Sequence, residues 1–340
     1  MEQFHRLRFW CLLALALTAA LVGGIWWFSV EGDNKRVPAL STLTIAMPTQ
    51  VGAGSLYMAE KEGLFLKHGL NITLQRFLLG KQALEAVLAG RADLAIVADT
   101  PFMLAVSRGE RIAALATVFE SRKTMAIFAL KERGIEGPTM LAAKNIGTVA
   151  GTNAEFFLDS MLDVHSIARS AVQITPLKPE QLIPAFRSGR VDAVTVWNPD
   201  LAKLEQEFGS RGLTIYGEDL FIYRFLLVGK KSFIDSHAIQ VRQVLAAVAE
   251  SNAYIKAHPD PSRAVLGERL GMAPSLLARS FDPGDFCLVL DQSLLVTLSE
   301  QSRWAGEKNL VRNTPQPNFL DHINAEPLNA VMPDANKIIQ

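Results

Sequence analysis

The fold is decided by a unit that occurs twice in the chain. Residues 86–101 are AVLAGRADLAIVADTP, and residues 185–200 are AFRSGRVDAVTVWNPD. In each copy a helix would end at a glycine, the chain would turn through an arginine, and a buried strand would begin near an aspartate. Any helix-to-strand turn can contain such a glycine, but matched identities in matched contexts favour a duplicated lobe. The identities share one offset of 99 residues: Gly90 with Gly189, Arg91 with Arg190, Asp93 with Asp192, and Val97 with Val196.

Around each copy, short runs rich in Val, Ile, Leu and Thr alternate with stretches of helical periodicity. Strand–helix–strand alternation predicts βαβ units and a mainly parallel sheet in each half. Helices are predicted at 153–165, 179–188 and 199–207 in the second half, and at matching places in the first. The predicted strands are 42–47, 71–77, 92–97 and 111–119, followed by 145–151, 171–177 and 191–196.

Two extended apolar segments, 121–131 and 217–233, are placed to carry the chain between two lobes. The sequence therefore predicts a first lobe of residues 42–124 plus 226–311 and a second lobe of residues 125–225. The mainly helical stretch from 236 to 308 is expected to pack back on the first lobe. The Pro- and Asn-rich tail, residues 312–340, is expected to lie loosely on the surface.

The N-terminus has a different character. Residues 9–30 run 22 positions without a charge, which is long enough for a helix to cross a bilayer. Basic residues within 5–8 precede the run and aromatic residues at 26–28 end it, so we expect a transmembrane anchor with the remaining chain outside the cytoplasm. A polar linker, residues 31–41, would follow. Cleavage near Thr18-Ala19-Ala20, as in a secretory signal peptide, stays open as the alternative.

Composition narrows the function classes. Hydrophobic residues make up 49% of the chain and charged residues 20%, enough for a sizeable core. Lys plus Arg and Asp plus Glu both total 34, and this zero net charge argues against a nucleic-acid partner. The only cysteines, Cys11 in the apolar run and Cys287, provide no disulfide framework.

The sequence contains few signs of catalysis. The six histidines have no metal-ligand spacing, and G-x-S-x-G, P-loop and G-x-G-x-x-G motifs are missing from the sequence. Cys287 precedes the apolar run LVL, which favours a buried thiol over a nucleophile. We therefore expect no catalytic residue, no cofactor and no metal.

Ligands of open parallel sheets bind beyond the carboxyl ends of the strands, and this is where the two copies differ. One continues as Ala98-Asp99-Thr100-Pro101 and the other as Trp197-Asn198-Pro199-Asp200. The shared residues would build the scaffold, and the others would face each other across a cleft. Two alternatives stay open: Asp99 and Asn198 as plain helix N-caps before proline, and Trp197 as a core residue.

Three stretches together resemble a known family. They are LTIAMPTQVGAGSLYMAEKEGLFLKHGLNITLQRF (43–77), GKQALEAVLAGRADLAIVADTP (80–101) and AFRSGRVDAVTVWNP (185–199). In this order they are similar to the nitrate/sulfonate/taurine family of ABC-transporter periplasmic substrate-binding proteins, over roughly residues 42–260. The resemblance implies an α/β fold of the periplasmic-binding-protein-like type II, with two lobes and a ligand cleft, here preceded by the N-terminal transmembrane helix.

The resemblance also implies a set of ligand contacts. Backbone N–H groups at the helix start after Gly151 could hold an oxyanion, or GTNAEFF could be an ordinary N-cap. Asn198 stands where the family often has an acidic residue, which leaves the ligand open. The implied contacts are Thr49, Gln50, Gly52, Gly54, Ser55, Gly80, Lys81, Asp99, Thr100, Glu120, Ser121, Thr152, Asn153 and Trp197.

By this resemblance the chain would be the solute-binding component of an ABC importer on the periplasmic face of the inner membrane. It would capture a small, anionic molecule of the sulfonate, nitrate or taurine kind. Its partners would be that solute, the permease with its ATPase, and the membrane through residues 9–30. The alternatives are a membrane-tethered ligand-sensing module and a thiamine-pyrimidine-related binder or enzyme. The chain's two cysteines disfavour the enzyme, whose relatives carry a cysteine-rich motif.

Overall fold

The computed structural model describes residues 40–217, 220–311 and 315–339. Within these ranges, no helix is both long enough and apolar enough to cross a bilayer. The predicted anchor, residues 9–30, and nearly all of the predicted linker lie outside the described residues.

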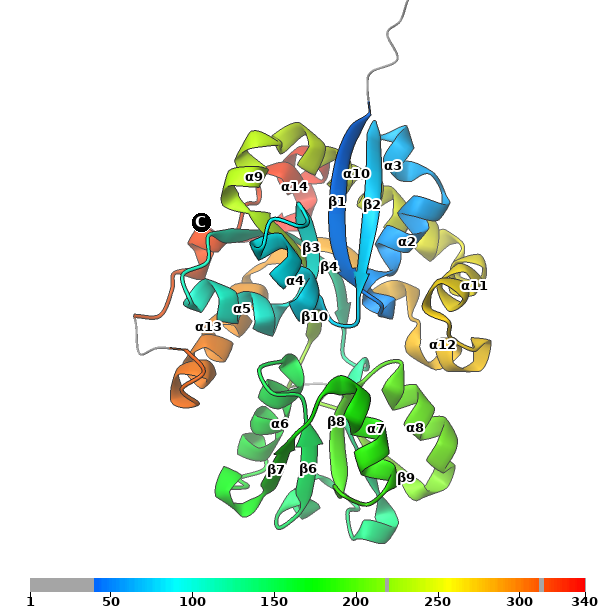
Figure 1. The fold of residues 1–340 in the computed structure, drawn as a ribbon, viewed down its shortest axis with the longest axis vertical. Coiled ribbons are helices and arrows are strands. Elements are labelled where there is room, and N and C mark those ends of the chain that lie inside the picture. Colours follow the sequence, from blue (N-terminus) through cyan, green and yellow to red (C-terminus); the bar gives the residue numbers. More distant parts are fainter. Residues whose placement is uncertain (1–39, 218–219, 312–314, 340) are drawn as a thin grey trace, which may run out of the picture. The chain divides into compact units, whose positions relative to one another are not determined.

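The strands form two sheets (Figure 1), and each sheet with its helices is called a lobe. Lobe 1 contains seven strands in the order β12-β11-β4-β10-β3-β1-β2, and lobe 2 contains five in the order β7-β6-β8-β5-β9. In lobe 1 the bounds are β1 (Ser41–Pro48), β2 (Leu70–Phe77), β3 (Leu94–Ala98), β4 (Ile112–Ser121), β10 (Tyr223–Lys230), β11 (Phe286–Asp291) and β12 (Asn336–Lys337). In lobe 2 they are β5 (Met125–Leu130), β6 (Asn145–Thr148), β7 (Gln173–Pro176), β8 (Ala193–Trp197) and β9 (Gly212–Ile215).

Helices pack against both sheets. Those of lobe 2 are α6 (Asn153–Val164), α7 (Pro179–Arg187) and α8 (Asp200–Phe208). Those of lobe 1 are α2 (Gly54–Lys61), α3 (Leu64–Lys67), α4 (Gly80–Leu88), α5 (Asp99–Ser107), α9 (Lys231–Ser236), α10 (Ala238–Ala257), α11 (Pro259–Leu270), α12 (Pro274–Ser280), α13 (Gln292–Glu307) and α14 (Glu326–Val331).

The two sheets share one topology. In lobe 1, β2, β1 and β3 are parallel neighbours, and β10 pairs antiparallel with β3. In lobe 2, β7, β6 and β8 are parallel neighbours, and β5 pairs antiparallel with β8. The expectation of mainly parallel sheets is therefore only partly right. Strands β5 and β10 each enter a lobe at the edge where its parallel strands end, so each must run in the opposite direction.

The repeated glycine has the same backbone role in both lobes. Gly90 ends α4 with a φ of 71°, and Gly189 follows α7 with a φ of 74°. Both values lie in the left-handed region that favours glycine. The N–H of the next residue then donates back to the helix, to the carbonyl of Ala86 in lobe 1 (2.8 Å) and of Ala185 in lobe 2 (3.0 Å). These bonds end both helices in the same way.

The repeated aspartate aligns neighbouring strands. The carboxylate of Asp93 accepts from the backbone N–H of Thr44 (2.7 Å), while its own N–H donates to the carbonyl of Thr44 (2.9 Å). Asp192 makes the same pair of bonds with Asn145, at 2.8 and 2.7 Å. Each aspartate thus sets the register between two parallel strands, which is why the pattern recurs.

The C-terminal segment is not loose, contrary to expectation. β12 pairs in parallel with β11, and α14 packs against α10. Phe319 and Leu328 are buried in the core of lobe 1. A few well-spaced apolar side chains anchor residues 315–339, although the composition of this segment is typical of loops.

Candidate functional site

The carboxyl ends of the parallel strands from both lobes meet at one small space. Its volume is about 20 Å³, which admits about one water molecule and no larger solute. We call it the strand-tip site. It is lined by Gln50, Leu79, Gly80, Lys81, Ala98, Pro101, Thr152, Asn153, Trp197, Tyr223 and Phe225.

Six of the predicted contacts therefore come together here, and they do so from both lobes. Lobe 1 contributes its predicted residues through the segments after β1 and β2, and lobe 2 contributes the start of α6 and the end of β8. Gly80 is required by packing, since a Cβ there would lie 3.0 Å from the Cα of Val97. The six are Gln50, Gly80, Lys81, Thr152, Asn153 and Trp197.

Asp99 lies beside this site and bonds across the lobes. Its side chain is fully buried, and its Oδ1 accepts from the N–H of Thr100 (2.8 Å) and from Nδ2 of Asn153 (2.9 Å). Its Oδ2 has no hydrogen-bond partner among the described residues. Burial raises the pKa of Asp99 to about 6, although the positive charge of Arg224 acts in the opposite direction.

The start of α6 is capped by its own side chains. Thr152 Oγ1 accepts from the N–H of Ala154 (3.2 Å), and Glu155 Oε2 accepts from the N–H of Gly151 (2.8 Å). In this arrangement the GTNAEFF segment forms a helix N-cap, in which side chains of the segment accept from two of its own backbone N–H groups. Trp197 is partly buried and packs against both hydrophobic clusters of the described residues, one of which lies entirely in lobe 2, while it also lines the strand-tip site.

Four predicted contacts lie elsewhere in lobe 1. A Cβ on Gly52 would come within 2.4 Å of the Phe225 ring, and one on Gly54 within 2.8 Å of the Phe286 ring. Ser55 donates to the side-chain oxygen of Asn252 in α10, and Thr49 donates to the carbonyl of Phe77. The glycines allow close packing of this loop on the sheet, and none of the four lines a cavity described here.

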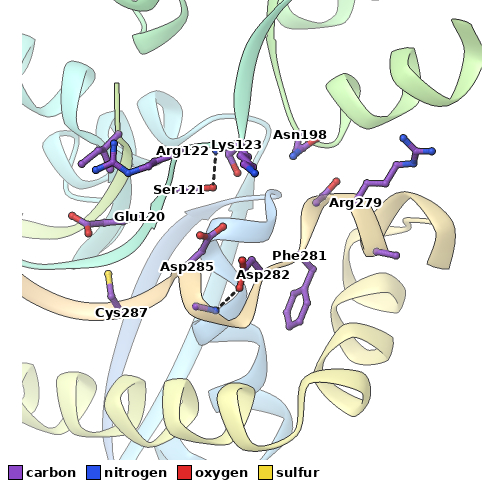
Figure 2. A pocket seen from close by; sticks show the side chains of 15 residues that line it. Glu120, Ser121, Arg122, Lys123, Asn198, Arg279, Phe281, Asp282, Asp285 and Cys287 are labelled. Carbon is purple, nitrogen blue, oxygen red and sulfur yellow. Dashed lines mark hydrogen bonds between the residues drawn. The ribbon is translucent and has the colours of Figure 1, made fainter. Parts of the chain in front are cut away.

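A second, larger cavity lies where the chain crosses between the lobes (Figure 2). Its volume is about 580 Å³, within the range of small-molecule sites. We call it the hinge cavity. Its lining includes the predicted contacts Glu120 and Ser121. The full lining is Glu120, Ser121, Arg122, Lys123, Thr124, Asn198, Ile222, Ala278, Arg279, Ser280, Phe281, Asp282, Gly284, Asp285 and Cys287.

The wall from Ala278 to Cys287 was missed by the sequence reasoning, which assigned this part of the chain to helices packing back on lobe 1. The one available signal was the pair of aspartates flanking Pro283-Gly284, directly before an apolar strand. Burial raises the pKa of the Cys287 thiol, so the thiol stays protonated and is a poor nucleophile.

The lobes also contact each other on both sides of these two spaces. On one side, Asp159 of α6 accepts from Nε1 of Trp304 in α13 (2.7 Å), and Phe156 packs edge-on against the Trp304 ring. On the other side, Arg279 of α12 lies 3.8 Å from Glu205 of α8. The structure is therefore a closed arrangement of the lobes. Across the described ranges, no three His, Cys, Asp or Glu side chains come together as a metal site.

Two lobes of the same topology, joined by crossing strands and closed on each other, define the class of periplasmic-binding-protein-like folds. A family model described as NMT1/THI5 like matches residues 51–262, more than half of the chain. The chain belongs to the NMT1/THI5-like family.

Curated relatives are distant. A Brucella abortus protein named only as a binding protein is 22% identical over 214 residues, which are 62% of this chain and 66% of that protein. The match thus spans slightly less than two thirds of that relative. A Bacillus subtilis protein, provisionally named as an aliphatic sulfonates-binding protein, is 25% identical over 255 residues, 73% of this chain and 75% of that protein.

Solved structures confirm the fold. The periplasmic aliphatic sulphonate binding protein SsuA from Escherichia coli matches with a TM-score of 0.75 and 20% identity, over 83% of this chain and 97% of that one. The desulfurization enzyme DszB matches with a TM-score of 0.67 and 16% identity, over 86% and 99%. The predicted two-lobed α/β architecture is confirmed, and the fold alone hosts both binding proteins and enzymes.

Proposed function

We propose that this chain is the solute-binding component of an ABC importer. It captures a small sulfonate-type solute between its lobes and delivers it to the permease and its ATPase. The main support is the meeting of strand ends from both lobes at the strand-tip site, together with the sulfonate-binding names of its relatives and structural neighbours.

The proposed mechanism is closure around the solute. The strand-tip site has a volume of about 20 Å³ in the arrangement described, so the lobes must separate to admit a solute and then close around it less fully than in this arrangement. Lys81 and the N-terminal end of α4 supply positive potential, which suits an anion. Among the described residues, the segments 122–124, 216–217 and 220–222 lie between the strands of the two lobes and would take up the rotation. The solute must bind the closed form more tightly than the open form, since otherwise it shifts no equilibrium.

We further propose the predicted organisation of the whole chain. Residues 9–30 tether the protein to the inner membrane, with the lobes in the periplasm, and secretion after cleavage is the alternative. The lobes divide into 42–124 plus 226–311 and 125–225. We assign no chemical step to this chain. The Cys287 thiol is protonated, and the sequence contains no G-x-S-x-G motif that would supply a serine nucleophile.

A thermal-shift screen of the full chain in mild detergent tests the proposal. The panel would contain alkanesulfonates, taurine and nitrate, together with pyrimidines as solutes of the thiamine-related alternative. A solute present at 100 times its Kd should stabilise the folded state by about 2.7 kcal/mol. A shift with sulfonates supports the proposal, a shift with pyrimidines alone supports the thiamine-related alternative, and a flat response to every sulfonate would contradict the assigned solute class.

A further inference from the structure

Asp99 is a buried carboxyl at the contact between the lobes, next to the strand-tip site. It begins α5 of lobe 1, and its Oδ1 accepts from Nδ2 of Asn153 in lobe 2 at 2.9 Å. Asn153 lines the strand-tip site, as do Ala98 and Pro101 on either side of Asp99 in the chain. A solute held in that site would therefore lie close to this carboxyl.

The carboxyl of Asp99 has no direct counter-ion among the described residues. The positive charge that acts on it is that of Arg224 in β10, whose Nε donates to Glu120 at 2.7 Å and whose two Nη atoms donate to hydroxyl groups of α13. Gln301 of α13 lies beside Asp99 and is neutral. Because Oδ2 of Asp99 also lacks a hydrogen-bond partner in the described part of the chain, the ionised form is poorly stabilised.

The elements that pack against α5 contribute three further ionisable groups at this end of the lobes. Lys81 of α4 lines the strand-tip site, and Glu155 of α6 pairs with Arg169. Tyr223 of β10 is buried, and burial together with the charge of Asp99 raises the pKa of this phenol, so it stays neutral. Burial raises the pKa of Asp99 itself to about 6, so this carboxyl exchanges its proton near neutral pH.

An anion in the strand-tip site would make ionised Asp99 still less stable. Two negative charges that share a poorly solvated site repel each other, and the weaker acid of the two then takes up a proton. A sulfonic acid is a much stronger acid than a carboxylic acid, so the solute would stay ionised and Asp99 would become neutral. Protonated Asp99 can still accept from Asn153 through Oδ1, while its hydroxyl group becomes a donor.

We propose that this chain takes up a proton together with its anionic solute, and that Asp99 binds the proton. The inference rests on the proposed function and adds a second ligand to it. Linkage is reciprocal, so a solute that promotes protonation of Asp99 must itself bind more tightly when Asp99 is protonated. Solute affinity should therefore rise as the pH falls.

Titration calorimetry with ethanesulfonate measures this proton directly. The full chain in mild detergent is titrated at pH 7 in phosphate and in imidazole, two buffers whose heats of ionisation differ. We expect uptake of about half a proton or more per bound solute at pH 7, and a Kd that falls about tenfold from pH 8 to pH 5. Ethanesulfonate stays ionised throughout this range, so it cannot itself take up the proton.

Two variants assign the proton to a residue. Asp99→Asn removes the titrating group and keeps the oxygen that accepts from Thr100 and Asn153, so it should bind ethanesulfonate without proton uptake and with a Kd independent of pH. Asp285→Asn is the matched control, because burial also raises the pKa of that carboxyl to about 6, and it should retain the wild-type uptake. Unliganded melting curves establish that both variants fold. Asp99→Ser, which is also uncharged, repeats the test if Asp99→Asn does not fold.

The outcomes separate this inference from the proposed function. Binding of ethanesulfonate without proton uptake, and with a constant Kd from pH 5 to pH 8, would overturn the inference and leave sulfonate capture standing. Uptake that persists in Asp99→Asn, or that disappears in Asp285→Asn, would overturn the assignment of the proton to Asp99. A folded chain that binds no alkanesulfonate would contradict both the proposed function and this inference.

Discussion

At the residue scale, Asp99 combines complete burial with a carboxylate oxygen that lacks a hydrogen-bond partner in the described part of the chain. Its pKa of about 6 lies above the ordinary value of 3.8. The native state therefore binds more protons than the unfolded chain between about pH 4 and pH 6. Protonated Asp99 makes its full contribution to the free energy of unfolding below pH 3.8, the pKa of this carboxyl in the unfolded chain. That contribution is lost as the pH rises through about 6, its pKa in the folded protein.

Asp99→Asn should remove this dependence. The amide oxygen can still accept from Thr100 and Asn153, while the buried negative charge is gone. We expect the variant to match the wild type near pH 4 and to exceed its free energy of unfolding by about 1–3 kcal/mol at pH 7.5. Urea denaturation at the two pH values measures this. A variant less stable than the wild type at pH 7.5 would show that ionised Asp99 is stabilising.

Trp197 is the aromatic residue that the sequence left between a ligand contact and a core residue. We expect Trp197→Ala to weaken solute binding at least tenfold while lowering the free energy of unfolding by only about 1–2 kcal/mol. Phe208→Ala, at a partly buried aromatic in the core of lobe 2, is the control and should affect stability alone. Calorimetric titration measures the solute affinity of both variants, and urea denaturation measures their stability. If Trp197→Ala binds the solute as tightly as Phe208→Ala does, Trp197 is a core residue and not a ligand contact.

At the scale of elements, the two glycine–arginine–aspartate turns form one structural unit used twice. Asp93→Ala and Asp192→Ala each remove the acceptor of a strand N–H, at Thr44 and Asn145. Each should lower the free energy of unfolding by about 1–3 kcal/mol, and the two losses should agree within about 1 kcal/mol. Urea denaturation provides the comparison. If only one of the two substitutions lowered the free energy of unfolding, the two aspartates would not have the same role in aligning their strands.

Substitutions of the glycines complement this pair. Around Gly90 and Gly189 no atom lies within 4 Å of an added Cβ, so only the left-handed backbone opposes alanine. Each change to alanine should cost about 1–2 kcal/mol. The two variants should therefore have similar melting temperatures by circular dichroism, both below that of the wild type. A variant that melts at the wild-type temperature would argue against a left-handed turn at its glycine.

The same turns explain how much could be predicted from sequence. The central strands and the helix ends were predictable because short runs rich in Val, Ile, Leu and Thr and glycine caps are local signals. The repeat extends even further, since Gln82 and Gln181 lie at the same offset of 99 residues and each accepts from the backbone N–H three residues earlier. Strand β12 has only two residues, and no local pattern could predict its pairing with β11.

The site was predictable only in part, for a related reason. Residues at strand ends, such as Lys81 and Trp197, follow from topology, and they do line the strand-tip site. The two glycines of the first loop look equally suited to a ligand, but their lack of a side chain serves packing against Phe225 and Phe286. The wall containing Asp285 joins the hinge cavity through tertiary contacts between distant segments, and periodicity carries no information about those.

At the scale of the whole closed unit, α6 and α13 hold the lobes together away from the solute. Asp159 also lies 3.1 Å from Nζ of Lys308 and pairs with Arg169, so it is a shared acceptor at this contact. The hydrogen bond from Trp304 to Asp159 therefore contributes directly to the stability of the closed form.

Trp304→Phe should keep the ring against Phe156 and lose the indole N–H. A hydrogen bond to a charged group contributes about 1.5–3 kcal/mol, so the closing equilibrium should shift toward the open form by about tenfold or more. Solute affinity measured by calorimetry should fall accordingly. Arg303→Ala, at the exposed neighbouring position, is the control. Unchanged affinity in Trp304→Phe would mean that this contact does not bias closure.

The central claim is that the lobes close on a solute at the joined strand ends. It is tested most directly by the distance between spin labels placed at Leu78 and Lys178, exposed positions just after β2 and β7. With Cys11 and Cys287 replaced by serine, pulsed electron paramagnetic resonance should give a broad distribution with long distances without solute. Saturating sulfonate should reduce it to a single short distance. Tight binding with an unchanged distribution would contradict capture by closure.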